Sequence, residues 1–136
     1  MVLRKKKLNI YAVQNFNKII NQAGTTRSEL EHLIDKLNLQ PVNICWQKDY
    51  KDNYANNGCI INIGNPIFLG GTHWCVVYKD YYFDPFGLPP ILALKDKKYN
   101  NKQIQGLNDG KCGLYCVLWL YYAKKNKINK FYEKFS

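Results

Sequence analysis

The sequence predicts an α+β fold, because helical periodicity near the N-terminus gives way to short β-type runs and then to an apolar helix. Residues 10–22 and 28–39 carry apolar side chains at helix-like spacing. The middle of the chain breaks into short apolar runs separated by turn residues. Residues 113–125 are apolar nearly all round in their first half, which is typical of a helix inside a core. We therefore expect one α+β domain over residues 1–136.

Two helices are expected before the first strand. The first should run from about Ile10 to Gln22. The second, over residues 28–39, follows a capping box in which the Thr26 hydroxyl accepts from the third amide and Glu29 reaches back. We expect Pro41 to end it. The apolar positions of the two helices are Val13, Phe16, Ile19 and Ile20, and then Leu30, Leu33, Ile34 and Leu37.

Short strands should follow, joined by two irregular stretches. A polar loop over residues 48–58 separates the first two strands, and a second loop over residues 85–103 contains three prolines and then a charged stretch. The expected strands are Val42–Trp46, Cys59–Ile63, Thr72–Tyr78 and Tyr81–Phe83.

The net charge of +10 makes a polyanion such as nucleic acid a candidate partner. The basic residues cluster in residues 4–7, 95–102 and 124–134. Binding through these clusters would be independent of base sequence and sensitive to salt. The alternative is a coding bias, because Lys, Asn, Ile and Tyr are all abundant and share A/T-rich codons.

Hydropathy and cysteine usage argue against a membrane-spanning, secreted or zinc-binding protein. The longest apolar run, Cys116–Ala123, is too short to cross a bilayer, and the basic N-terminus lacks the apolar core of a signal peptide. We therefore expect a soluble intracellular protein without a membrane partner. The five cysteines are odd in number and no pair has the spacing of a zinc site, so buried thiols are expected and no metal.

His73 is the one good candidate for a catalytic base. The other histidine, His32, lies off the apolar stripe of its helix and should be on the surface. If Lys79-Asp80 is a two-residue turn, residues whose numbers sum to 159 face each other, and His73 shares a sheet face with Asp84. A turn or cap carboxylate before Pro85 is the alternative role for Asp84. The opposite face, expected to point into the core, carries Trp74, Val76 and Tyr78.

Cys112 is the candidate nucleophile, because it stands at the start of the apolar helix. A helix N-terminus and a neighbouring imidazolium both favour a thiolate. Gly113 permits close approach of a substrate backbone. Asp109, in the turn before Cys112, has an N-cap as its alternative role, and Cys116 should be buried one helical turn further on.

Four segments, taken together, resemble the adenovirus protease family in their order along the chain and in the identity of their residues. They are Gly70–Trp74, Tyr82–Gly87, Gln105–Asn108 and Cys112–Cys116. The family pattern has Gly-Gly-x-His-Trp, then an aromatic-Phe-acid-Pro-Phe-Gly strand end, and then Gln-Gly-x-Asn-x-x-x-Cys-Gly-Leu-x-Cys. The seven-residue step from Gln105 to Cys112 fits this viral branch better than the SUMO-protease branch of the same fold.

This resemblance implies a papain-like cysteine protease fold with a circularly permuted order, in which a central mixed sheet packs against a buried helix that carries the cysteine. It implies that His73 is the general base, Asp84 orients His73, Cys112 is the nucleophile and Gln105 donates to the oxyanion. No cofactor is implied. The expected substrates are viral precursor proteins of the virion, cleaved by a monomer in the virion or in the cytoplasm or nucleus of the host cell. A virophage or polinton-like element would fit the composition.

The chain also departs from the family pattern. The interval from His73 to Asp84 is shorter by an even number of residues, which keeps both side chains on one face. No cysteine lies between Asp84 and Gln105, so activation by a peptide disulfide-linked there is not expected. The chain ends sooner after Cys112 than the adenoviral enzyme, so part of the helical domain is expected to be missing. Two rival functions stay open: a ubiquitin-like-protein protease or acyltransferase on this fold, and a non-catalytic basic DNA-binding protein.

Overall fold

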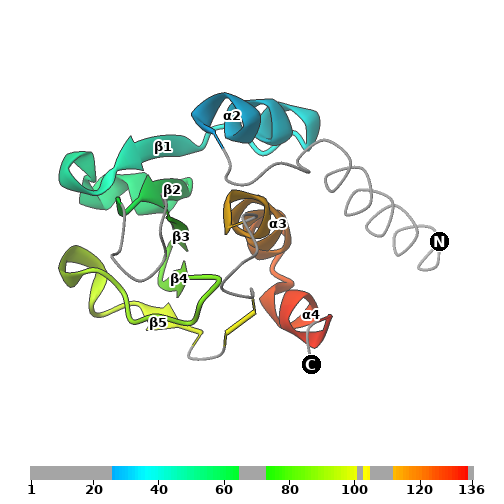
Figure 1. Ribbon diagram of the computed structural model, residues 1–136. Helices are drawn as coiled ribbons and strands as arrows, with labels where there is room; N and C mark the ends of the chain where they lie inside the picture. The colour runs from blue at the N-terminus through cyan, green and yellow to red at the C-terminus, as the bar shows by residue number, and fades with distance from the viewer. Residues whose placement is uncertain (1–25, 65–72, 101–102, 105–111, 135–136) are drawn as a thin grey trace.

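The fold is organised around a five-stranded mixed sheet with the strand order β1-β2-β3-β4-β5 (Figure 1). The computed structural model describes residues 26–64, 73–100, 103–104 and 112–134. Strands β1 and β2 are parallel, β3 is antiparallel to both of its neighbours, and β5 is parallel to β4. The strands are β1 Asn43–Trp46, β2 Cys59–Asn62, β3 Trp74–Tyr78, β4 Tyr81–Phe83 and β5 Lys98–Tyr99. The first four confirm the expected strands to within one or two residues at each described end.

Helix α2, Arg27–Lys36, begins as its sequence predicts. The Thr26 hydroxyl accepts a hydrogen bond from the Glu29 amide, and the Glu29 carboxylate accepts from the Thr26 amide. The helix ends before residue 39, so the expected end near Pro41 is wrong. The chain leaves the helix when Asn38 adopts a φ of 56°, in the left-handed region that asparagine tolerates.

Helix α3, Cys112–Lys124, lies at the centre of the described part of the chain, in contact with the sheet, with α2 and with α4 (Figure 1). It packs on β2 and β3, with α2 on one side and α4 on the other. Ten of its thirteen residues are buried, which confirms the interior position that its apolar sequence predicts. Helix α4, Ile128–Glu133, follows a turn at Asn126 and was not expected from the sequence.

Both faces of the sheet are covered. On the helix-facing side, Trp74, Val76 and Phe83 join the core formed with α2, α3 and α4. On the other side, Cys75, Val77, Tyr82 and residues of β2 pack under Ala55 and Leu94. Ala55 belongs to a 3-10 helix, Asp52–Asn56, and Leu94 to another, Leu92–Leu94, so the two stretches expected as irregular loops form the second cover.

The prediction that these two stretches are irregular loops is wrong, because both contain regular elements. A further 3-10 helix, Gln47–Asp49, lies in the first, and β5 lies in the second. The expected helix over residues 10–22 falls outside the described residues. Within the part of the chain that is described, no helix is both long enough and apolar enough to span a membrane.

Candidate active site

The β3–β4 hairpin brings His73 and Asp84 together as its sequence predicts. Its register pairs Tyr78 with Tyr81, Val77 with Tyr82 and Val76 with Phe83. The turn is made by Lys79 and Asp80, and Lys79 adopts a φ of 55°. His73 immediately precedes β3 and Asp84 immediately follows β4, so both project from the same end of the hairpin. The predicted register is confirmed, and the two side chains meet at this end of the hairpin.

The two side chains form a buried pair. His73 Nε2 lies 2.8 Å from Asp84 Oδ1, and each residue is only 1% exposed. The same carboxylate oxygen accepts a hydrogen bond of 2.7 Å from the Phe86 amide. The Phe86 ring lies 4.7 Å from the imidazole, centroid to centroid. Asp84 is therefore a partner of the histidine as well as a turn carboxylate, and the two roles considered for it coexist.

Cys112 reaches the same imidazole from a distant part of the chain. It is the first residue of α3 and is 4% exposed. Its side chain is hydrogen-bonded to His73. Because Nε2 of the ring is engaged by Asp84, Nδ1 is the nitrogen left for the sulfur. The structure thus places the cysteine, the histidine and the acid in a continuous line of contact.

The electrostatics of the site favour a charged His73. Burial alone would lower the pKa of the imidazole, but hydrogen bonds and Coulombic attraction from Asp84 and Cys112 outweigh it and raise the pKa from 6.5 to about 9. The raised pKa favours the protonated form of His73 at neutral pH, between the carboxylate and the sulfur. The other histidine, His32, is exposed on α2, as the sequence predicts.

The other four cysteines differ from Cys112 in their surroundings. None of them has a histidine beside it among the contacts of the described chain. Burial raises the pKa of the thiols of Cys45, Cys59, Cys75 and Cys116. Cys45 and Cys59 lie with their sulfurs 3.4 Å apart, and Cys116 donates to the Trp74 carbonyl. Among the described residues no group of three His, Cys, Asp or Glu side chains could hold a metal ion.

One further polar residue belongs to the site. Asn100 is 9% exposed and its side chain is hydrogen-bonded to both backbone groups of Asp84. The sequence gives no signal for it, because an asparagine in a charged stretch belongs to no motif. The predicted oxyanion residue, Gln105, lies outside the described residues.

The comparisons with known proteins agree with the resemblance drawn from the motifs. No family model matches the chain. The sequence is 28% identical over 131 residues to the protease of Bovine adenovirus 4, a match that covers 73% of this chain and 65% of that protein. It is 27% identical over 141 residues to the protease of Ovine adenovirus D serotype 7, with 80% of this chain and 70% of that protein covered. The matched region thus spans about two thirds of the length of these relatives.

Proposed function

We propose that this chain, a relative of the adenovirus proteases, is a cysteine endopeptidase with Cys112 as nucleophile, His73 as acid–base group and Asp84 as the residue that orients His73. The observation that carries the proposal is the buried series of contacts from Cys112 to His73 and from His73 to Asp84. One imidazole is hydrogen-bonded to a carboxylate and to a thiol at the N-terminus of a core helix. This is the arrangement that nucleophilic catalysis by cysteine requires.

The proposed reaction follows from these contacts. The Cys112 sulfur attacks the carbonyl carbon of the scissile bond, and the C=O electron pair moves to oxygen. The intermediate collapses, the C–N bond breaks and His73 gives its proton to the departing amine. Water then attacks the thioester, His73 takes a proton from it, and the carboxylic acid leaves as the sulfur is released. Asp84 holds the ring in the orientation that presents Nδ1 to the sulfur.

Two groups are proposed to stabilise the oxyanion. The Cys112 amide is the first proposed donor, because it lies at the N-terminal end of α3, where the helix dipole favours negative charge. The Gln105 side-chain amide is the second proposed donor, on the strength of the sequence resemblance. Preorganised donors of this kind contribute about 3 kcal/mol each to lowering the barrier.

The proposed substrates are precursor proteins of a virion, as the resemblance to the adenovirus protease family implies. A ubiquitin-like-protein protease or an acyltransferase would use the same contacts, so substrate digestion has to separate these functions. Incubation of the purified chain with cognate virion proteins should produce new termini detectable by mass spectrometry. Cleavage of ubiquitin-type conjugates and not of virion proteins would favour the rival activity.

A thiol-labelling experiment tests the chemistry directly. Iodoacetamide at neutral pH should modify Cys112 in the folded chain well before the other four thiols, and Cys112→Ala should lose both this label and peptide hydrolysis. Cys45→Ala is the matched control, because Cys45 is the half-buried thiol outside the site. Equal labelling of all five cysteines, or hydrolysis that survives Cys112→Ala, would contradict the proposal.

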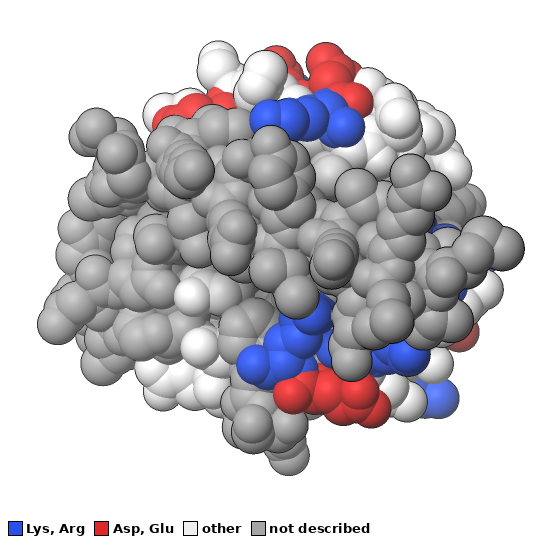
Figure 2. All heavy atoms as spheres, turned by 90° about the vertical axis from the view of Figure 1, so that its right-hand side faces the viewer, with Lys and Arg blue, Asp and Glu red and all other residues white. Residues whose placement is uncertain are grey.

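Nucleic-acid binding is a separate proposal that rests on net charge. On the face shown in Figure 2, the described lysines and arginines lie in separate groups beside acidic side chains. Several lysines also lie over tyrosine rings, among them Lys124, Lys125 and Lys134. Binding to duplex DNA that weakens steeply with added salt would support this role.

A further inference from the structure

Asp84 lies just beyond the end of the β3–β4 ladder, so the sheet does not fix it. The last pair of that ladder in the described chain is Val76 with Phe83. The residue after Asp84 is Pro85, which has no N–H to donate. A catalytic acid at the end of a ladder needs other contacts to hold its backbone, because a displacement of about 1 Å at a catalytic group can cost about 100-fold in rate.

Asn100, which directly follows the neighbouring strand β5, supplies such contacts. Its Oδ1 accepts a hydrogen bond of 3.0 Å from the Asp84 amide, and its Nδ2 donates one of 2.7 Å to the Asp84 carbonyl. The backbone ladder between β4 and β5 ends one residue earlier, with Tyr82 paired to Tyr99. The side-chain amide of Asn100 therefore continues the ladder by imitating a peptide group, with one donor and one acceptor at the required spacing.

The contacts of Asp84 divide into two sets. Asn100 binds both backbone groups, and the Gly87 amide also donates to the Asp84 carbonyl at 2.8 Å, while the carboxylate is left to the Phe86 amide and to His73 Nε2. The second carboxylate oxygen, Oδ2, is buried without a hydrogen-bond partner in the described chain. The direction of the carboxylate thus depends on where the backbone of Asp84 is held.

From this geometry we infer that Asn100 is a positioning residue, which holds the Asp84 backbone so that the carboxylate meets the His73 ring. The inference rests on the proposed function, because it gives Asn100 a part in catalysis through Asp84. It requires an amide at this position. A carboxylate would keep the acceptor but would set an oxygen against the Asp84 carbonyl, and an alanine would remove both contacts.

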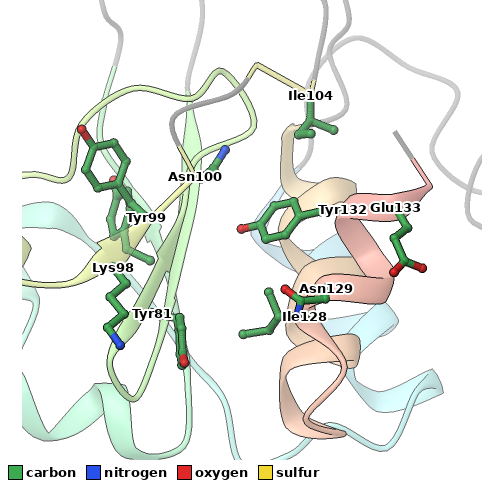
Figure 3. A pocket seen from close by; sticks show the side chains of 10 residues that line it. Tyr81, Lys98, Tyr99, Asn100, Ile104, Ile128, Asn129, Tyr132 and Glu133 are labelled. Carbon is green, nitrogen blue, oxygen red and sulfur yellow. The ribbon is translucent and has the colours of Figure 1, made fainter. Parts of the chain in front are cut away.

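The neighbouring cavity provides a matched control. Asn100 lies on the sheet side of a cavity of about 620 Å³, and Asn129 of α4 lies on the opposite side (Figure 3). Asn129 is exposed, and it is the same residue type in the same cavity without a contact to Asp84 among those described. Loss of Asn129 should therefore leave the site unchanged.

The test compares Asn100→Asp, Asn100→Ala and Asn129→Ala with the wild-type chain. We expect both Asn100 variants to lose about 10-fold to 100-fold in kcat, with KM changed little, because the contact orients a catalytic group and does not bind substrate. We also expect the alkaline limb of the pH–rate profile to move down from about pH 9, since a misplaced Asp84 no longer holds the proton on His73. Asn129→Ala should have the wild-type kcat and the same alkaline limb of the pH–rate profile as the wild-type chain.

An NMR titration of the His73 imidazole separates this inference from the proposed function. If the wild-type chain hydrolyses no peptide, the proposed function fails, yet the titration still measures whether Asn100 controls the His73–Asp84 pair. A lower His73 midpoint in both Asn100 variants supports the inference. An unchanged midpoint and rate would overturn it. Loss of the folded state in both variants, judged by melting temperature, would also overturn it and make Asn100 a structural residue.

Discussion

Replacement of His73 by glutamine should make the stability of the protein less dependent on pH. His73 is buried, and its contacts with Asp84 and Cys112 raise its pKa from 6.5 to about 9. The folded state therefore binds this proton more tightly than the unfolded state. The stabilisation is fully present below pH 6.5, where both states are protonated, and is lost as the pH rises through about 9, where both are neutral.

The interval between these two pKa values corresponds to about 3 kcal/mol of unfolding free energy. Urea denaturation of the wild-type chain and of His73→Gln, followed at several pH values, gives the difference between their unfolding free energies. This difference should fall by up to about 3 kcal/mol between pH 6.5 and pH 9. Glutamine does not titrate, and the titration of groups that do not contact His73 contributes equally to both chains. These contributions therefore cancel from the difference between the unfolding free energies.

Asp84→Asn provides the internal check on this reasoning. Hydrogen bonding to Asp84 is the largest of the effects that raise the pKa of His73. In Asp84→Asn, the unfolding free energy contributed by the proton on His73 should therefore fall much less over the same pH range. The difference between the unfolding free energies of the wild-type chain and His73→Gln should fall between pH 6.5 and pH 9. If it stays constant or grows, the assignment of a proton to His73 at neutral pH is refuted. A fall of equal size in Asp84→Asn would refute the role of the carboxylate.

Two further outcomes are expected. Gln105→Ala should lower kcat by about 10²-fold to 10³-fold with little change in KM, measured on a fluorogenic peptide, and alkylation of Cys112 should survive; a rise in KM alone would make Gln105 a substrate-binding residue. Thr26→Ala should lower the unfolding free energy by about 1 kcal/mol, because the capping box of α2 is lost, whereas Ser28→Ala in the same turn should change it by less than about 0.5 kcal/mol. Equal effects of these two alanines would contradict the capping assignment.

The parts of the fold that could be predicted from sequence are those fixed by local rules. The capping box at Thr26 depends on residues three apart, and the β3–β4 register follows from a two-residue turn. That register by itself predicts that His73 and Asp84 share one face of the sheet. The approach of Cys112 to His73 is different, since 38 positions separate them and no local pattern links them. Only the resemblance of the motifs to a known family joined the two.

The features that escaped prediction depend on contacts between distant segments. Strand β5 has only two residues, Lys98 and Tyr99, and it exists because β4 offers an edge to pair with, not because its own sequence favours a strand. Asn100 follows directly, and its role appears only when β5 has brought it beside Asp84. A charged stretch read as a loop therefore contains both the last strand and a support of the candidate catalytic acid. A side-chain amide has no reactivity that marks it in a sequence, so the cysteine, the histidine and the acid can be predicted, but not the amide that holds one of them in place.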